Sequence, residues 1–354
     1  MESRILKKII LKACVTTFLI TLSLCGCQKK QDNVNISKGM ELLEQYDYQG
    51  ALECFETAAL YNEDEQLYNR GEGLAYMGLG DYASAEAAFL ESISFAEGNL
   101  GGLEYDTNYY LATACMKQGK YKEAQDIYSA IIAMKKKETD AYYLRACSLL
   151  KQNNYDEAKA DFEKAFALEP KNLELVTDAY VEMAAAGFET EGKAYLQEII
   201  QKKDKSLKDG EKGIIYYYLE DYTNARTYLD AFVSGDDPEM SLILGQTYEK
   251  LGDMNYAASV YQTYLDKNAP DAAIYNSLGI CLMNQQKYQE ALEKFQAGID
   301  MGNSAYLQNL KFNMIVTYEH LGNFAQAKTL MEEYLKAYPD DENAKREYEF
   351  LQTR

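Results

Sequence analysis

Tryptophan is absent from the 354-residue chain, and histidine occurs only once, at position 320. This histidine falls near the end of a predicted helix, just before the Gly322 turn, which argues against a catalytic triad, and a single histidine excludes metal sites with several histidine ligands. The missing tryptophan weighs against sugar binding by stacking on indole rings. The sequence also lacks a glycine-rich phosphate loop and any C-x-x-C pair. We therefore expect a protein with no cofactor and no bound metal, and without enzymatic activity.

Basic residues are scarce relative to acidic ones, at 36 against 56, which gives a net charge of −20. If residues 1–26 are removed, 32 basic and 55 acidic residues remain and the net charge is −23. A body with this charge is repelled by nucleic acid and by anionic lipid headgroups. We therefore expect no nucleic-acid partner.

What the chain does contain is a repeated spacing, in which a small residue is followed four positions later by a large apolar one. The offset of four places both on one helix face, where the small residue lets a neighbouring helix approach closely. Recurrence at a period near 34 is typical of stacked helical hairpins. The nine pairs are Ala51/Phe55, Ala85/Phe89, Ala124/Tyr128, Ala158/Phe162, Gly192/Leu196, Ala225/Leu229, Ala257/Tyr261, Ala291/Phe295 and Ala327/Met331.

Two further features recur in phase with these pairs. An aromatic residue stands three positions before the small residue in seven repeats, and Glu189 and Met254 are the exceptions. Turn residues come just before it, and a glycine or asparagine there ends the first helix in a left-handed conformation. An aspartate at the turn can cap the second helix. The sequence therefore predicts left-handed turns at Gly80, Gly119, Asn153, Gly252 and Gly322.

This pattern resembles the tetratricopeptide repeat, a helix–turn–helix unit of about 34 residues. Its position 8 is small, and the residues here are Gly39, Gly73, Ala112, Ala146, Gly213, Gly245 and Gly279. Its position 32 is proline, as at Pro170 and Pro339. The fifth repeat matches most weakly, because Tyr180 fills position 8 and Gly192 replaces the alanine.

The resemblance implies an all-α fold, a right-handed superhelical solenoid of about nine such repeats over residues 35–340. Residues 341–354 read as a C-terminal capping helix, with Ala344, Tyr348 and Leu351 on one side. A solenoid needs such a cap to cover the apolar face of its last repeat.

Residues 1–26 look like a bacterial lipoprotein signal peptide. Four basic residues precede an apolar segment of twelve residues at 13–24, which is short for a membrane span of about 20. The run Leu24-Cys25-Gly26-Cys27 resembles a lipobox, which implies that Cys27 is lipidated and becomes the first residue. Residues 27–34 would form a short tether. We expect an anchor on the extracytoplasmic face of a bacterial cell membrane, with an uncleaved apolar segment as the alternative.

Four of the seven cysteines fall inside predicted helices, at Cys54, Cys115, Cys147 and Cys281. Cys115 and Cys147 occupy similar points of consecutive first helices, so either a disulfide or two buried thiols fits their spacing. We favour buried thiols that act as small apolar residues.

In tetratricopeptide proteins the first helix of each repeat lines a concave face that binds protein or peptide. An apolar, methionine-rich surface suits such docking. The first four repeats are the favoured part, and the alternative is that neighbouring turns of the chain cover some of these positions. Carried over to this chain, the resemblance places there Met40, Leu74, Met77, Tyr109, Met116, Tyr143, Leu150 and Tyr217.

Together these features indicate a non-catalytic scaffold that holds protein partners in the bacterial cell envelope. Its partners would be proteins or peptides through the concave face, and the lipid bilayer through Cys27. The alternative is an extracytoplasmic lipoprotein that captures peptides or glycans. A sensor domain is a third interpretation, but the chain carries no output module.

Overall fold

The computed structural model describes residues 33–95, 101–203, 206–232, 237–302 and 305–354. The regular structure in those ranges is helical, without a strand. The chain divides into two compact units, Met1–Tyr195 (unit 1) and Leu196–Arg354 (unit 2). Among the described helices, none combines the length and the apolar character needed to cross a bilayer. Cys27 and the predicted signal peptide, residues 1–26, lie outside the described residues.

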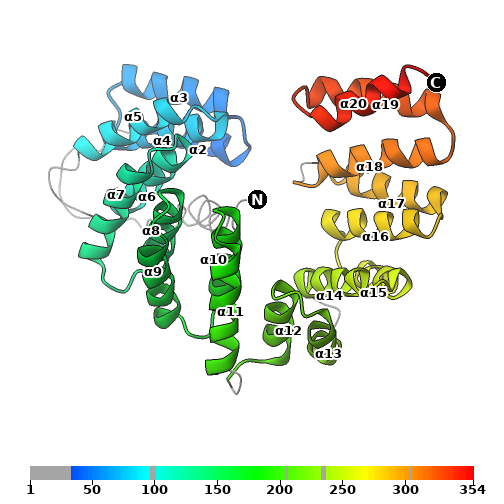
Figure 1. Cartoon of the computed structure of the whole chain (residues 1–354). Coiled ribbons are helices and arrows are strands. Elements are labelled where there is room, and N and C mark those ends of the chain that lie inside the picture. Colours follow the sequence, from blue (N-terminus) through cyan, green and yellow to red (C-terminus); the bar gives the residue numbers. More distant parts are fainter. Residues whose placement is uncertain (1–32, 96–100, 204–205, 233–236, 303–304) are drawn as a thin grey trace. The chain divides into compact units, whose positions relative to one another are not determined.

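Unit 1 is built from helical hairpins that follow one another along the chain (Figure 1). In each hairpin the even-numbered helix is called the first helix and the odd-numbered one the second. The second helix of the fifth hairpin crosses the boundary between the units. The helices are α2 (Val34–Glu44), α3 (Tyr48–Leu60), α4 (Glu65–Leu79), α5 (Tyr82–Ser94), α6 (Gly102–Lys117), α7 (Tyr121–Met134), α8 (Thr139–Lys151), α9 (Tyr155–Leu168), α10 (Glu174–Ala185) and α11 (Glu189–Lys203).

Unit 2 continues the same arrangement and ends with an unpaired helix, α20. The prediction of about nine helical hairpins followed by a final helix is therefore confirmed over the described residues. The helices are α12 (Asp209–Tyr218), α13 (Tyr222–Phe232), α14 (Pro238–Lys250), α15 (Met254–Lys267), α16 (Ala272–Asn284), α17 (Tyr288–Asp300), α18 (Leu307–His320), α19 (Phe324–Ala337) and α20 (Glu342–Leu351).

The small-and-large pairs predicted from the sequence form the core of each hairpin. All eight alanines of these pairs are 0% exposed, and none of the nine large partners exceeds 2%. The large side chain lies against a small residue of the first helix. A Cβ atom added at Gly279 would stand 2.3 Å from Phe295 Cε1, and one at Gly245 would stand 2.2 Å from Tyr261 Cε1. The missing side chains therefore let the two helices approach until the ring fills the space between them.

The fifth hairpin reaches the same packing by a reversed arrangement. Tyr180 occupies the position that is small in seven of the other hairpins, and Gly192 stands where the second helix has alanine elsewhere. A Cβ atom at Gly192 would lie 3.0 Å from Tyr180 Cδ2, so the glycine leaves room for the tyrosine ring. Leu196 then replaces the aromatic residue and is 0% exposed. The sequence of this repeat matches weakly because the large residue stands on the first helix and the small residue on the second, and the two changes compensate each other in the packing.

Each hairpin turn contains one residue in the left-handed conformation, with φ between 59° and 91°. The predicted turns at Gly80, Gly119, Asn153, Gly252 and Gly322 are confirmed. The predicted aspartate caps are also present, since Asp81 accepts a hydrogen bond from the Ser84 amide at 3.1 Å. Three turns use residues other than glycine or asparagine, at a cost of about 1–2 kcal/mol each: Tyr46, Glu220 and Gln286.

A recurring glutamine bond joins consecutive hairpins. The glutamine directly follows a first helix, and its Nε2 atom donates to the carbonyl oxygen of the first residue of the preceding second helix. The three bonds run from Gln118 to Tyr82 at 3.0 Å, from Gln152 to Tyr121 at 3.4 Å, and from Gln285 to Met254 at 3.1 Å. Because each bond ends on a backbone carbonyl, it fixes the position of one hairpin on the next without requiring a particular side chain as acceptor.

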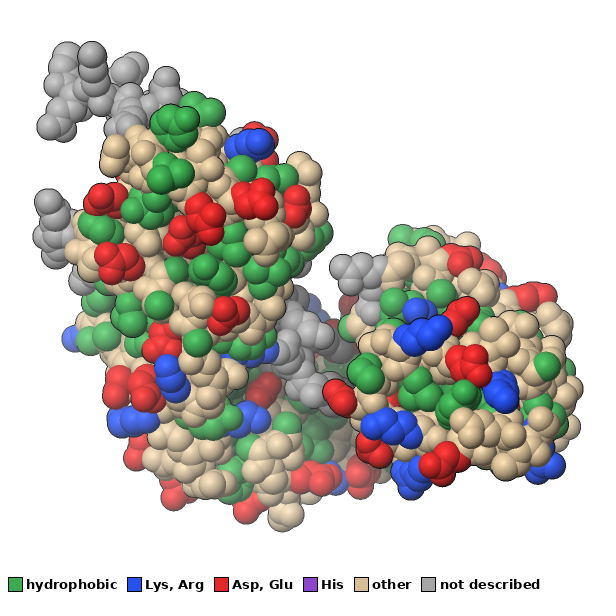
Figure 2. All heavy atoms as spheres, turned by 90° about the horizontal axis from the view of Figure 1, so that it is seen from above, with side chains coloured by type: hydrophobic (Ala, Val, Ile, Leu, Met, Phe, Trp, Pro, Cys, Tyr) green, Lys and Arg blue, Asp and Glu red, His purple; other side chains and the backbone are tan. Residues whose placement is uncertain are grey.

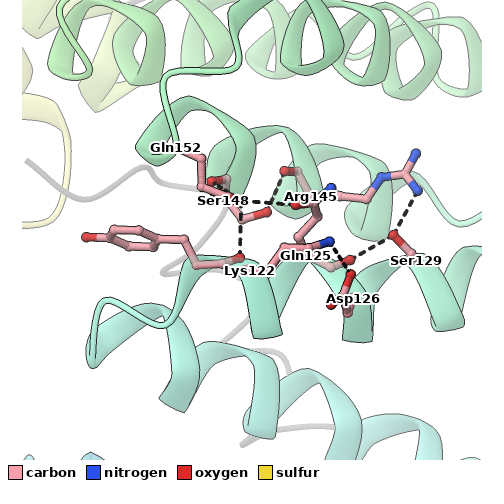
Figure 3. A network of polar contacts seen from close by, with 8 residues as sticks. Lys122, Gln125, Asp126, Ser129, Arg145, Ser148 and Gln152 are labelled. Carbon is pink, nitrogen blue, oxygen red and sulfur yellow. Dashed lines mark hydrogen bonds and ion pairs between the residues drawn. The ribbon is translucent and has the colours of Figure 1, made fainter.

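Figure 3 shows the polar network around one of these joints, between α7 and α8. Arg145 donates from Nη1 to Ser129 Oγ of α7 at 3.1 Å. Its Nε and Nη2 atoms pair with both carboxylate oxygens of Asp161 on α9, at 2.7 and 2.8 Å. Gln152 Nε2 also donates to Gln125 Oε1 at 3.1 Å. A bidentate, charge-assisted pair is among the stronger polar contacts, so Arg145 fixes α8 between its two neighbours.

Helix α20 covers the last hairpin, as predicted for residues 341–354. Ala344 is 0% exposed and Leu351 is 1% exposed, and both pack into one cluster with Met331. Asp341 caps the helix by accepting hydrogen bonds from the Asn343 and Ala344 amides, both at 3.0 Å. Its carboxylate also accepts a hydrogen bond from Tyr334 Oη at 2.6 Å, which ties the cap to α19.

A pair of carboxyl groups lies between α18 and α20. Burial, together with the neighbouring Glu347 carboxyl group of α20, raises the pKa of Glu319 to about 7. Since the pKa of Glu319 is higher in the folded chain than in the unfolded one, the folded state binds the proton more tightly. The stability that this proton confers is present below about pH 4.5 and declines as the pH rises through 7.

We expect Gly279→Ala to destabilise unit 2, because the new methyl group overlaps the Phe295 ring. Overpacking of this kind costs about 1–3 kcal/mol. Gly102→Ala is the matched control, since nothing lies within 4 Å of its added Cβ atom. Urea unfolding followed by circular dichroism measures both variants. Equal stability of the Gly279→Ala variant and the unmodified protein would contradict the role assigned to this glycine.

We expect Glu319→Gln to remove a pH dependence from the attachment of α20. A neutral amide at position 319 cannot ionise, so the difference in stability between the variant and the unmodified protein grows as the pH rises from 5 to 8. The unfolding midpoint in urea, measured at several pH values, gives this difference. Glu349→Gln is the control, because Glu349 is exposed on the same cap helix. A difference that stays constant with pH would contradict the raised pKa of Glu319.

Candidate partner-binding face

The first helices of neighbouring hairpins contact one another within each unit. In unit 1, α2 contacts α4, α4 contacts α6, and α8 contacts α10. In unit 2, α12, α14, α16 and α18 form a similar row. We call the side of α2, α4 and α6 that carries the predicted binding residues the inner face. Of the eight predicted residues, those on it are Met40, Leu74, Met77, Tyr109 and Met116.

All five of these side chains are half-buried, so each keeps part of its surface accessible. Met40 also packs on the core cluster formed by Ile36, Leu52 and Phe55. The backbone and core contacts of each helix therefore hold the apolar side chains in place, while their outer surfaces remain available. Thioether and aliphatic groups of this kind adapt to an incoming apolar surface.

Two predicted residues do not line an accessible surface. Tyr143 is 0% exposed and Leu150 is 2% exposed. The ring of Tyr143 packs edge-on against Phe162 at a centroid distance of 5.4 Å. Helix α10 contacts both α8 and α9, so this part of the first-helix row is covered. The expectation that Tyr143 and Leu150 line the binding face is corrected, and the accessible part is limited to the first three hairpins of unit 1.

Tyr109 joins the inner face to the core below it. Its hydroxyl group lies 3.3 Å from the hydroxyl group of Tyr105, and its ring contacts that of Tyr128. Burial raises the pKa of Tyr109 well above its usual range, with the neighbouring Tyr105 adding to this. Tyr109 therefore stays a neutral phenol that can donate one hydrogen bond and offer a ring edge.

Arg70 provides a positive charge at the same face. Its side chain is 4% exposed, and its guanidinium carbon lies 5.4 Å from the centroid of the Tyr110 ring. No atom of the described residues accepts a hydrogen bond from Arg70 Nε. Burial raises the pKa of nearby Asp106, and the charges of Arg70 and Lys135 oppose that increase. A buried donor without an acceptor is uncommon in folded proteins.

Tyr217, the predicted residue in unit 2, lies in a different environment. It is half-buried, and its hydroxyl group donates to Gln246 Oε1 at 2.9 Å. Burial raises the pKa of Tyr217 to about 12. The nearby Glu249 accepts a hydrogen bond from Tyr261 Oη at 2.6 Å. The polar groups on this part of unit 2 therefore already bind one another.

The described cysteines are not arranged for chemistry. Cys54, Cys115, Cys147 and Cys281 are buried free thiols, so Cys115 and Cys147 do not form the disulfide that their spacing allowed. Burial raises the pKa of Cys115 to about 11 and the pKa of Cys147 well above its usual range. A thiol of this kind is a poor nucleophile and metal ligand. Within the described ranges, no three histidine, cysteine or carboxylate side chains gather as they would around a metal ion.

One shallow depression lies elsewhere, in the loop between α9 and α10. Its lining is the surface run Glu169–Asn172, and no first helix contributes to it. Carboxylates are spread over the face seen in Figure 2, with lysine and arginine side chains among them. The apolar inner face of α2, α4 and α6 is therefore the better candidate for binding.

Comparison with known proteins gives the same repeat. Profiles described as the tetratricopeptide repeat match residues 36–99, 139–172, 211–273, 255–306 and 310–341, which together make up more than half of the chain. Among solved structures, that of yeast Tom70 has a TM-score of 0.59 and 15% sequence identity. The match covers 98% of this chain and 71% of that one, and at this identity it shows the fold alone.

Two curated proteins of Saccharomyces cerevisiae are similar in sequence. The peroxisomal targeting signal receptor is 24% identical over 260 residues, covering 69% of this chain and 42% of that protein. The anaphase-promoting complex subunit CDC16 is 29% identical over 92 residues, covering 23% of this chain and 11% of that protein. The chain spans less than half the length of either curated relative.

We expect Tyr143→Ala to destabilise unit 1, because it leaves a cavity beside Phe162 in the core. Replacing a buried aromatic residue by alanine costs about 3–5 kcal/mol. Leu74→Ala should cost less, because Leu74 is half-buried. Urea unfolding of the two variants gives the comparison. If Tyr143→Ala were the milder change, the assignment of Tyr143 to the core would be wrong.

Proposed function

The chain belongs to the tetratricopeptide-repeat family, and we propose that it is a non-catalytic scaffold anchored to the outer side of a bacterial cell membrane. The family binds proteins and peptides, so the partner we propose is a protein or an exposed segment of one. The proposed site is the inner face of α2, α4 and α6. The proposed anchor is a lipid on Cys27.

The row of apolar side chains across three first helices is the observation that carries this proposal. Met40 on α2, Leu74 and Met77 on α4, and Tyr109 and Met116 on α6 are all half-buried. Side chains at equivalent positions of stacked helices form a continuous strip, and an amphipathic helix or extended segment can lie along it. Methionine adapts its shape to the partner, which favours a scaffold over a rigid active site.

Arg70 supplies a positive charge beneath this site. Its guanidinium group is buried and lies over the Tyr110 ring, so it acts on a partner through its charge and not through direct contact. In a chain with a net charge of −20, a buried arginine also favours an acidic group of the partner at this point.

The membrane anchor is supported by the sequence of the first 27 residues. A basic start, a short apolar segment and a lipobox-like run ending at Cys27 are typical of bacterial lipoproteins. Two or three acyl chains give stable anchoring, whereas one chain gives only reversible binding. A scaffold held in this way would concentrate its partner at the membrane surface.

We expect Leu74→Glu combined with Met77→Glu to reduce partner capture without unfolding the chain. The two carboxylates would place charge in the apolar strip, and binding of a partner would then have to remove water from these charges at a high cost in free energy. Crosslinking on intact cells, followed by mass spectrometry of the captured proteins, measures the loss. Leu79→Glu is the matched control, because Leu79 is 47% exposed on the same helix but lies outside the inner face.

The same experiment separates the scaffold from a capture lipoprotein. A scaffold gives one or more envelope proteins in a stable ratio, and the double variant loses them while the control retains them. A protein that captures small ligands gives no protein partner, and a bound peptide or sugar is then found on the purified chain. Circular dichroism of each variant excludes loss of helix as the cause.

A further inference from the structure

The junctions between consecutive hairpins of unit 1 lie along one edge of the unit. Each hairpin reverses the chain, so every second helix ends at the edge where the next first helix begins. Contacts between successive junctions define this junction edge. They join Glu63 to the Asn35 amide at 3.1 Å, Gln66 Nε2 to Glu104 Oε1, and Lys135 Nζ to the Tyr105 ring at 3.2 Å from its centroid.

The junction edge carries large apolar side chains that are exposed to solvent. Leu60 is 82% exposed, Val34 and Tyr61 are each 65% exposed, Met134 is 46% exposed and Phe95 is 36% exposed. These five are among the fourteen large hydrophobic residues that are exposed among the described residues. A concentration of this kind marks a surface that is covered when the protein is in place.

One short basic run lies at this edge. Lys135–Lys137 follow Met134 directly and are exposed, and they form the only run of three consecutive basic residues in the sequence. Acidic residues stand beside them, since Glu138 follows the run and the charge of Lys135 acts on Asp106. Positive charge at this edge is therefore confined to the three lysines.

The position of the proposed anchor decides what covers this edge. Val34 opens α2 and follows Cys27 by seven residues, which can span at most about 25 Å when extended. The Asn33 side chain accepts a hydrogen bond from the Asp64 amide at 3.3 Å, so the chain enters unit 1 at the junction edge itself. The edge is therefore the part of the described chain nearest to a bilayer that holds Cys27.

We propose that the junction edge of the first three hairpins lies in the interfacial region of the membrane, with Leu60, Tyr61 and Phe95 among the acyl chains and headgroups. This inference rests on the proposed anchoring near Cys27. Aromatic residues favour this depth of the bilayer, because their rings are apolar while the tyrosine hydroxyl group reaches water. The lysines of Lys135–Lys137 meet the phosphates, which offsets the repulsion from the acidic remainder of unit 1.

Contact at the junction edge would orient the inner face. The first helices would begin at the membrane and extend away from it. The proposed binding strip of α2, α4 and α6 would then rise from the membrane surface and face the water beside it. A second attachment also strengthens the anchor, since apolar side chains add to the affinity supplied by the acyl chains.

The absence of tryptophan from the chain makes this contact directly measurable. Tyr61→Trp places a single fluorophore at the junction edge, and Tyr46→Trp places one at the opposite end of the same hairpin. Tyr46 is 68% exposed against 65% for Tyr61, so the two probes are matched in solvent contact. The full protein is recovered from membranes in detergent and reconstituted into phosphatidylcholine vesicles with or without brominated acyl chains.

We expect the brominated lipid to quench the Tyr61→Trp variant and to leave the Tyr46→Trp variant unquenched. Adding Leu60→Ser to Tyr61→Trp should weaken the quenching, because it removes the most exposed apolar side chain of the edge. Absence of quenching at position 61, or equal quenching at both positions, overturns the inference. If position 61 is not quenched, a protein partner becomes the better candidate for covering the junction edge, because these vesicles contain no other protein.

A separate measurement distinguishes this inference from the proposed anchor. The intact mass of the recovered protein shows whether Cys27 carries lipid. If it does not, the proposed anchor fails, and Cys27 is then coupled to a maleimide lipid so that the chain is held at the same point. Quenching of the Tyr61→Trp variant in that case supports the membrane-facing edge without the natural anchor.

Discussion

The contact between the large apolar residue of the second helix and a small residue of the first helix sets the geometry of most hairpins. Phe295 lies where a side chain on Gly279 would be, and Tyr261 lies in the same way over Gly245. This close approach buries the ring and the neighbouring alanine together, so one contact both holds the hairpin closed and defines its thickness. The stacking of hairpins, and therefore the surfaces they present, depends on this repeated distance.

The same packing determines which surfaces are left for binding. Each first helix uses one side for the aromatic contact and another for its neighbours, and the remaining side of α2, α4 and α6 keeps its apolar residues half-buried. The hairpin junctions form a second surface, because the helices end and begin there. Unit 1 therefore offers a face made of helix sides and an edge made of helix ends, which we assign to a protein partner and to the membrane.

Local spacing explains what could be predicted from the sequence. The pairs such as Ala85/Phe89 fix one helix face, and turns such as Gly80 and Asn153 need only their own backbone conformation, so both were predictable. The burial of Tyr143 was not, because it depends on how α10 covers α8. The left-handed conformation of Tyr46, Glu220 and Gln286 could not be predicted either, because these residue types disfavour it and the tertiary packing imposes it. The hydrogen bond from Gln152 could not be predicted, because its acceptor is a backbone carbonyl group, which every residue type carries.

The polar groups explain why we place binding on unit 1 although both units repeat the same hairpin. In unit 2, Tyr217 already donates to Gln246, and Tyr261 already donates to Glu249. A partner seated there would have to replace bonds that the unit makes by itself, and the net gain from exchanging one hydrogen bond for another is small. In unit 1, Arg70 lies buried beneath the inner face, and its positive charge favours an acidic partner. The two units can therefore share one fold while the apolar strip of the first is the better candidate for binding.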